Sequence, residues 1–115
     1  MIRFLLPFAL IAPPVAAQDA VPQLTLEQRM LLRCSAAFAL VAEGQANGNA
    51  AAQQYPAMAE RGREFFVRAS ARVMEEAGLD RNQISAALSA EAQDIWDNGT
   101  LDEVMSPCLA LLPPA

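Results

Sequence analysis

The sequence contains no histidine and no lysine, and its 115 residues include only two cysteines, one tryptophan and one tyrosine. Without histidine, no nucleophile can be activated by an imidazole, and haem attachment through Cys-x-x-Cys-His is excluded. No segment alternates between apolar and polar residues with a period of two, so the sequence predicts no β-strand. These absences predict an all-α protein that is not an enzyme and holds no cofactor.

The first residues have the composition of a secretory signal peptide. A basic residue, Arg3, precedes an apolar run at 4–12, and small residues follow before the expected cleavage site. The alternative is an uncleaved membrane anchor, but the run is shorter than the roughly 20 apolar residues of a spanning helix. We therefore expect export to the periplasm, with a signal peptide at 1–17, a loose lead-in at 18–24 and one helical domain at 25–115.

Acidic residues dominate the charge of the processed chain. Cleavage would leave seven arginines (eight minus Arg3) against thirteen acidic residues, a formal charge of −6. This balance argues against nucleic acid or an anionic membrane as the main partner. We expect no nucleic-acid partner, no stable membrane insertion after processing and no bound metal.

Helix start and stop signals divide the domain into four helical segments. Capping boxes mark helix starts, and glycines that can take the left-handed conformation mark helix ends. The predicted capping residues are Thr25, Asp80 and Thr100. The predicted helices are 26–43, ended by Gly44; 56–77, ended by Gly78 and preceded by a turn at 50–54; 81–98, ended by Gly99; and 101–112, kinked or restarted at Pro107.

Each predicted helix has one apolar face at helical spacing. Faces of this kind bury against one another, so we expect a small four-helix domain, orthogonal or bundle-like. Gly62 would allow another helix to approach closely. The predicted faces are Leu26, Met30, Cys34, Ala37, Phe38 and Val41; Met58, Gly62, Phe65, Phe66, Ala69, Val73 and Ala77; Ile84, Ala87, Leu88 and Ile95; and Leu101, Val104, Met105, Cys108 and Leu112.

The two cysteines lie on apolar faces of a chain predicted to enter an oxidising compartment. Two cysteines allow one intramolecular pairing, so we predict a disulfide between Cys34 and Cys108. An intermolecular bridge or a free thiol is the alternative. Redox catalysis is disfavoured because the sequence has no Cys-x-x-Cys motif and no histidine to lower a thiol pKa.

Arg33 and Glu91 fall within the apolar stripes of their predicted helices. The sequence favours an arrangement in which each charged head reaches solvent at the rim of its stripe. If both point inward, they are expected to form a buried ion pair, because an unpaired buried carboxylate is costly. Catalysis by Glu91 would need a second group, for which only another carboxylate or Tyr55 is present.

Two further patterns have a simpler structural explanation. The stretch 94–105 resembles a calcium loop with Gly99 at its sixth position, but Trp96 and Met105 stand where oxygen ligands belong. A helix–turn–helix junction explains the same residues. Along the second helix, arginines could form an anion site, but interleaved glutamates favour a solvated face of i,i+4 ion pairs. These arginines are Arg61, Arg68 and Arg72.

Three segments, 32–38, 61–66 and 105–112, resemble those of a group of small exported proteins from GC-rich Gram-negative bacteria. This resemblance implies an exported helical protein and no particular activity. A fainter resemblance, in architecture only, is to the HdeA-type periplasmic acid-stress chaperones, which are small, helical and tied by one long-range disulfide. Cys34-Ser-Ala-Ala-Phe38 is similar to the Cys-x-x-x-Phe segment of their first helix.

From these features we expect a non-enzymatic periplasmic protein that acts through protein–protein contact, with a role in envelope or acid stress. The partner protein is not indicated by the sequence. The alternative is a carrier that holds a small apolar ligand between its helices, because methionines supply adaptable apolar surface. The methionines considered for this are Met30, Met58, Met74 and Met105.

Overall fold

The computed structural model describes residues 23–114, and every regular element in this range is helical. The elements are α1 (Leu26–Ala46), η2 (Ala52–Gln54), α2 (Arg61–Ala77), α3 (Arg81–Asn98), α4 (Leu101–Cys108) and η3 (Leu109–Leu111), where η denotes a 3-10 helix. The predicted all-α class is confirmed, and residues 23–114 contain no strand. The predicted signal peptide (1–17) and most of the lead-in (18–24) lie outside the described residues.

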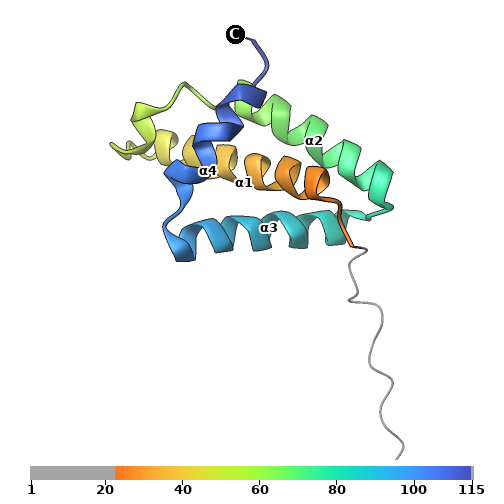
Figure 1. Ribbon diagram of the computed structural model, residues 1–115. Helices are drawn as coiled ribbons and strands as arrows, with labels where there is room; N and C mark the ends of the chain where they lie inside the picture. The colour runs from red at the N-terminus through yellow and green to blue at the C-terminus, as the bar shows by residue number, and fades with distance from the viewer. Residues whose placement is uncertain (1–22, 115) are drawn as a thin grey trace, which may run out of the picture.

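Helix α1 lies at the centre of the arrangement. In Figure 1, α2 and α3 run along opposite sides of α1, and α4 crosses it. Five consecutive α1 residues, Cys34–Phe38, are buried. Successive residues point about 100° apart around a helix, so burial of five in a row requires neighbours on every side.

The start of α1 differs from the prediction. Leu26 and Met30 were expected in the core, but their side chains are 77% and 46% exposed. They lie on the same stripe as Cys34, towards the N-terminus, beyond the point where α4 joins α1 at Cys108. The eight-residue α4 therefore covers only the later part of this stripe. The predicted faces of the other segments are buried or half-buried.

The core has two parts. The larger lies under α4 and includes Phe38 and Phe65, whose rings meet edge to face with centroids 5.1 Å apart. The smaller surrounds the turn between α2 and α3 and includes Leu32, Val73 and Leu79. Gly62 lies against Phe38, and a Cβ atom built there would be 3.4 Å from the Phe38 Cβ, so the predicted close approach is confirmed.

Several helix ends follow the sequence signals. Complete capping boxes are formed by Thr25 with Gln28 and by Asp80 with Gln83. Gly78 ends α2 in the left-handed conformation with φ 68°, and the Leu79 N–H donates to the Met74 carbonyl at 3.0 Å. These contacts satisfy backbone groups that a helix end would otherwise leave unpaired.

The prediction that Gly44 ends the first helix is wrong, because α1 continues to Ala46. Gly44 instead permits a close tertiary contact. A Cβ atom at this position would lie 2.7 Å from the Cβ of Ala52 in η2, which is closer than real Cβ contacts. The missing side chain therefore allows η2 to pack directly on α1.

The predicted start of the second helix at Pro56 is also wrong, since α2 begins at Arg61. The side chain of Gln45 instead binds the backbone between Ala52 and Met58, which runs from η2 into an irregular loop. Its amide nitrogen donates to the carbonyls of Ala52, Tyr55 and Pro56, and its oxygen accepts from the Met58 N–H at 2.9 Å. Backbone groups satisfied by a side chain do not need a helix.

The junction between α3 and α4 lacks the predicted third capping box. Thr100 has φ −102° and ψ 17°, outside the extended region that capping requires, and its hydroxyl is buried without a hydrogen-bond partner among the described residues. Gly99, with φ 60°, turns the chain directly into α4. Pro107 is accommodated within α4, which ends one residue later and continues as η3.

The predicted disulfide is confirmed. Cys34 and Cys108 are bonded, with their Cα atoms 5.4 Å apart, and both residues are buried. The bridge joins the end of α4 to α1 and closes 74 positions of sequence.

Candidate functional site

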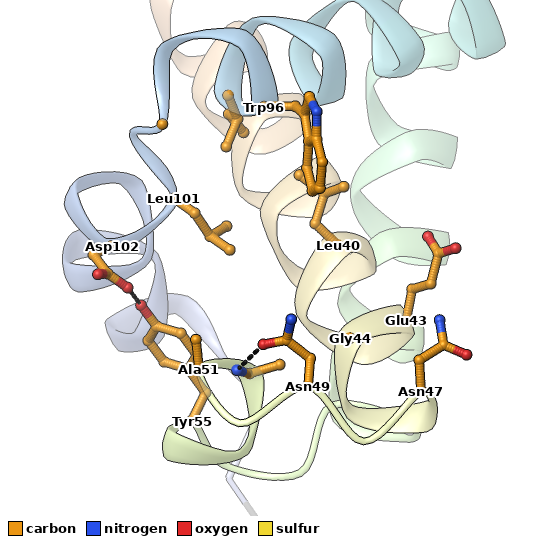
Figure 2. A pocket seen from close by; sticks show the side chains of 13 residues that line it. Leu40, Glu43, Gly44, Asn47, Asn49, Ala51, Tyr55, Trp96, Leu101 and Asp102 are labelled. Carbon is orange, nitrogen blue, oxygen red and sulfur yellow. Dashed lines mark hydrogen bonds between the residues drawn. The ribbon is translucent and has the colours of Figure 1, made fainter.

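An open groove of about 670 Å³ lies where the ends of α1 and α3 meet η2 and the start of α4 (Figure 2). Two stretches of sequence, 40–55 and 95–102, supply all of its walls. We call it the Trp96 groove. Its lining residues are Leu40, Glu43, Gly44, Asn47, Asn49, Ala51, Ala52, Tyr55, Ile95, Trp96, Gly99, Leu101 and Asp102.

Local features of the sequence create this groove. The contact between Gly44 and Ala52 places η2 against the end of α1. Asn49 fixes the connecting loop, because its side-chain oxygen accepts from the Ala52 N–H at 3.1 Å. On the other side, the turn at Gly99 brings Leu101 to face the same space. The groove therefore depends on two tight turns and on one glycine inside a helix.

Trp96 is the most unusual residue of the groove. It is the only tryptophan of the chain, and it is 75% exposed. Figure 2 shows its ring beside Leu40, at the edge of the groove and opposite Leu101. A tryptophan offers a large apolar area and often dominates the energy of protein interfaces. Its exposure here leaves that area free for a partner.

Tyr55 and Asp102 close one side of the groove. The Tyr55 hydroxyl donates to the Asp102 carboxylate and so joins η2 to α4 (Figure 2). This hydrogen bond, with smaller contributions from burial and from the negative charge of Asp102, raises the pKa of Tyr55 to about 12. Tyr55 is therefore protonated at neutral pH and acts as a hydrogen-bond donor.

The candidate pair of Arg33 and Glu91 lies elsewhere. Arg33 Nη1 is 2.8 Å from Glu91 Oε2 and 2.9 Å from Asp94 Oδ2, so one guanidinium joins α1 to two carboxylates of α3. The Arg33 side chain is 33% exposed and that of Glu91 16%, which places the pair at the edge of the core. The hydrogen bonds that Arg33 donates to Asp94 and, as the next largest cause, to Glu91 raise the pKa of Arg33.

Asp94 was not predicted as part of this pair. It stands one helical turn after Glu91 on α3, a spacing that could have indicated it. Neither this ion-pair group nor the disulfide lines the Trp96 groove. Both therefore connect elements of the fold without forming walls of the groove.

The calcium-loop-like stretch and the arginines of the second helix form structural contacts. Within 94–105, α3 ends and α4 begins, as the helix–turn–helix explanation requires, and Asp94 contacts Arg33 and Asn98. Arg68 pairs with Glu64 at 2.7 Å on the exposed side of α2. The remaining predicted arginines are also engaged: Arg72 with Glu27 and Glu76, and Arg61 with the Pro113 carbonyl.

A second, smaller groove of about 450 Å³ lies between α1, α2 and α3. Small residues such as Ala36 and Ala92 line much of it. The Ser70 hydroxyl, which belongs to this lining, is buried and has no hydrogen-bond partner among residues 23–114.

The methionines do not form the apolar surface expected of a carrier. Met58 and Met105 are fully buried in the core, and Met74 packs in the smaller core cluster. Met30 is exposed on α1, and neither groove has a methionine in its lining.

Comparisons of the chain with protein-family models, with curated proteins and with solved structures give no match. The resemblances drawn from sequence therefore stay predictions. Among the described residues, no helix is long and apolar enough to cross a membrane. The same part of the chain holds no group of three or more histidine, cysteine, aspartate or glutamate residues placed to bind a metal ion.

Proposed function

We propose that this chain is a non-enzymatic, exported binding protein that holds an apolar segment of another protein in the Trp96 groove. The observation that carries the proposal is the exposure of Trp96 beside a groove floored by Leu40 and Leu101. Aromatic side chains next to a pocket are the usual anchors of protein interfaces. The groove is wide enough for a few side chains, so the ligand is a short segment of the partner.

Rigid walls support the same proposal. Gly44 and Ala52 fix η2 on α1, Tyr55 and Asp102 fix η2 to α4, and the disulfide fixes α4 to α1. When a groove is already formed before binding, the protein loses little conformational entropy on binding its ligand. A small contact area can then still give measurable affinity for the ligand.

A role in envelope stress, including acid stress, belongs to the same proposal. Acid removes negative charge from an acidic chain such as this one, while the disulfide between Cys34 and Cys108 would still limit how far the chain opens. The test is light scattering by an aggregating protein. This chain should suppress scattering in acid more strongly than at neutral pH, and equal effects at both would remove the acid role.

Binding itself is tested with fluorescently labelled apolar peptides by anisotropy. Trp96→Ala should weaken binding by about thirtyfold, the loss typical of an interface anchor. Leu26→Ala is the matched control, because Leu26 is equally exposed but lies on the first turn of α1. Equal affinities for the two variants would refute the proposal. Native mass spectrometry addresses the carrier alternative, which requires a co-purifying lipid.

A further inference from the structure

We infer that the partner segment is cationic, with arginine or lysine on both sides of an apolar centre. The inference rests on the proposed function and specifies the chemistry of the ligand. It arises from the charged residues that line the Trp96 groove, Glu43 and Asp102, which are both acidic.

The groove walls contain no basic residue. Arginines of the described residues occur only at 29–33 and at 61–81, whereas the groove is built from 40–55 and 95–102. The two groove stretches contain carboxylates and no arginine or lysine. Those carboxylates are Glu43, Asp97 and Asp102.

The lining carboxylates stand on opposite sides of the apolar floor. Figure 2 shows Glu43 on the α1 side and Asp102 on the α4 side, with Leu40, Trp96 and Leu101 between them. A segment lying across the groove would therefore meet a negative charge at each end of its apolar centre.

These charges are available to a partner. Within residues 23–114, Glu43 and Asp102 form no ion pair with an arginine, unlike Glu64, Glu76 and Glu91. The Tyr55 hydroxyl occupies only Oδ1 of Asp102. Charges left unpaired at the edge of an apolar patch select partners by sign and speed their encounter.

Trp96 adds to the same preference. Its exposed ring can receive a guanidinium or ammonium group on its face, and this attraction is separate from that of the carboxylates. Arginine suits this position because its planar group stacks on aromatic rings and pairs with carboxylates at the same time.

The experiment compares three capped peptides with one Leu-Phe-Leu centre and flanks of arginine, glutamine or glutamate. Binding is followed by the emission of Trp96, the only tryptophan of the chain. At low salt the arginine peptide should bind about fivefold to tenfold more tightly than the glutamine peptide, and the glutamate peptide most weakly. The advantage should shrink as salt is raised, because ions screen exposed charges.

A matched pair of variants separates the groove from the overall negative charge of the chain. Glu43→Gln and Glu75→Gln remove the same charge, but Glu75 is exposed on α2, outside the groove. Glu43→Gln should lower the advantage of the arginine peptide about threefold, and Glu75→Gln should leave it unchanged. Equal effects of the two variants would overturn the inference, because attraction would then be non-specific.

Two other outcomes distinguish this inference from the proposed function. If all three peptides bind equally and shift the Trp96 emission, the groove binds apolar segments and the cationic preference is refuted. If no peptide shifts the emission, the proposed function fails, and the inference fails with it.

Discussion

Tyr55 in the loop after η2 donates its hydroxyl hydrogen to Asp102 in the first turn of α4, and this bond links segments 47 positions apart. The hydrogen bond raises the pKa of Tyr55 to about 12. A raised pKa means that the folded protein holds the proton more tightly than the unfolded chain, in which tyrosine has a pKa of about 10. The stabilisation is therefore complete below about pH 10 and is lost as the pH rises through about 12.

The first prediction follows from this sign. Because Tyr55 is the only tyrosine, the absorbance of its phenolate reports one site. The midpoint of this pH titration should be about 12 in the folded protein and about 10 in denaturant. The free energy of unfolding should fall between these pH values. In Tyr55→Phe that fall should be absent. A phenolate midpoint near 10 in the folded protein would contradict the bond to Asp102.

The second prediction concerns the contact of Gly44 with Ala52. In an exposed helix, Gly→Ala stabilises by about 1 kcal/mol. Here Gly44→Ala should destabilise the protein, by about 1–3 kcal/mol, because the added Cβ would overlap that of Ala52. Thermal unfolding measures the effect. The double variant Gly44→Ala with Ala52→Gly exchanges the two side chains and should recover part of the loss, whereas a clash unrelated to η2 would not be relieved.

The third prediction concerns Arg33. Arg33→Met keeps the apolar stem but leaves the half-buried Glu91 without its partner, so the free energy of unfolding should fall by about 1 kcal/mol. Arg68→Met is the control, because it breaks an exposed i,i+4 pair that is worth less than about 0.5 kcal/mol. Urea unfolding of both variants decides the matter. Losses of the same size would show that the Arg33 group contributes no more than a surface pair.

The fourth prediction concerns the disulfide. For the 74-position separation of Cys34 and Cys108, the chain-entropy model gives roughly 4.4 kcal/mol of stabilisation, and measured bridges usually give less. Cys34→Ser with Cys108→Ser should therefore lower the melting temperature strongly. Protein from an oxidising host should contain no titratable thiol when denatured without reductant. Free thiols in that sample would contradict the bridge.

Local signals in the sequence predicted the features that depend on neighbouring residues. Thr25 and Asp80 cap helices because their partners stand three residues later, and Gly78 ends α2 because only its own conformation matters. The disulfide was predictable because two cysteines leave one intramolecular pairing.

Tertiary contacts explain what the sequence could not predict. Gly44 has the sequence signal of a helix end, but the absence of its side chain allows Ala52 of η2 to pack against α1. This contact depends on how the chain folds back after α1, which the local sequence does not indicate. Gln45 follows the predicted end of the first helix, yet it lies in α1 and holds the backbone at 52–58 through its side chain. The Trp96 groove was missed for the same reason, because it forms only when η2 and α4 are placed against α1 and α3. A lone tryptophan near the end of a helix was the one available signal.

The central claim is that the Trp96 groove binds a segment of a partner protein, and amide chemical-shift mapping by NMR tests it most directly. On titration with the arginine-flanked Leu-Phe-Leu peptide, shifts should concentrate at 40–55 and 95–102, and the indole N–H of Trp96 should be among the largest. Amides on the exposed side of α2, around Arg68, should not move. Shifts centred on α2, including those around Ser70 in the smaller groove, or no shifts at a peptide concentration that saturates the change in Trp96 emission, would contradict the account.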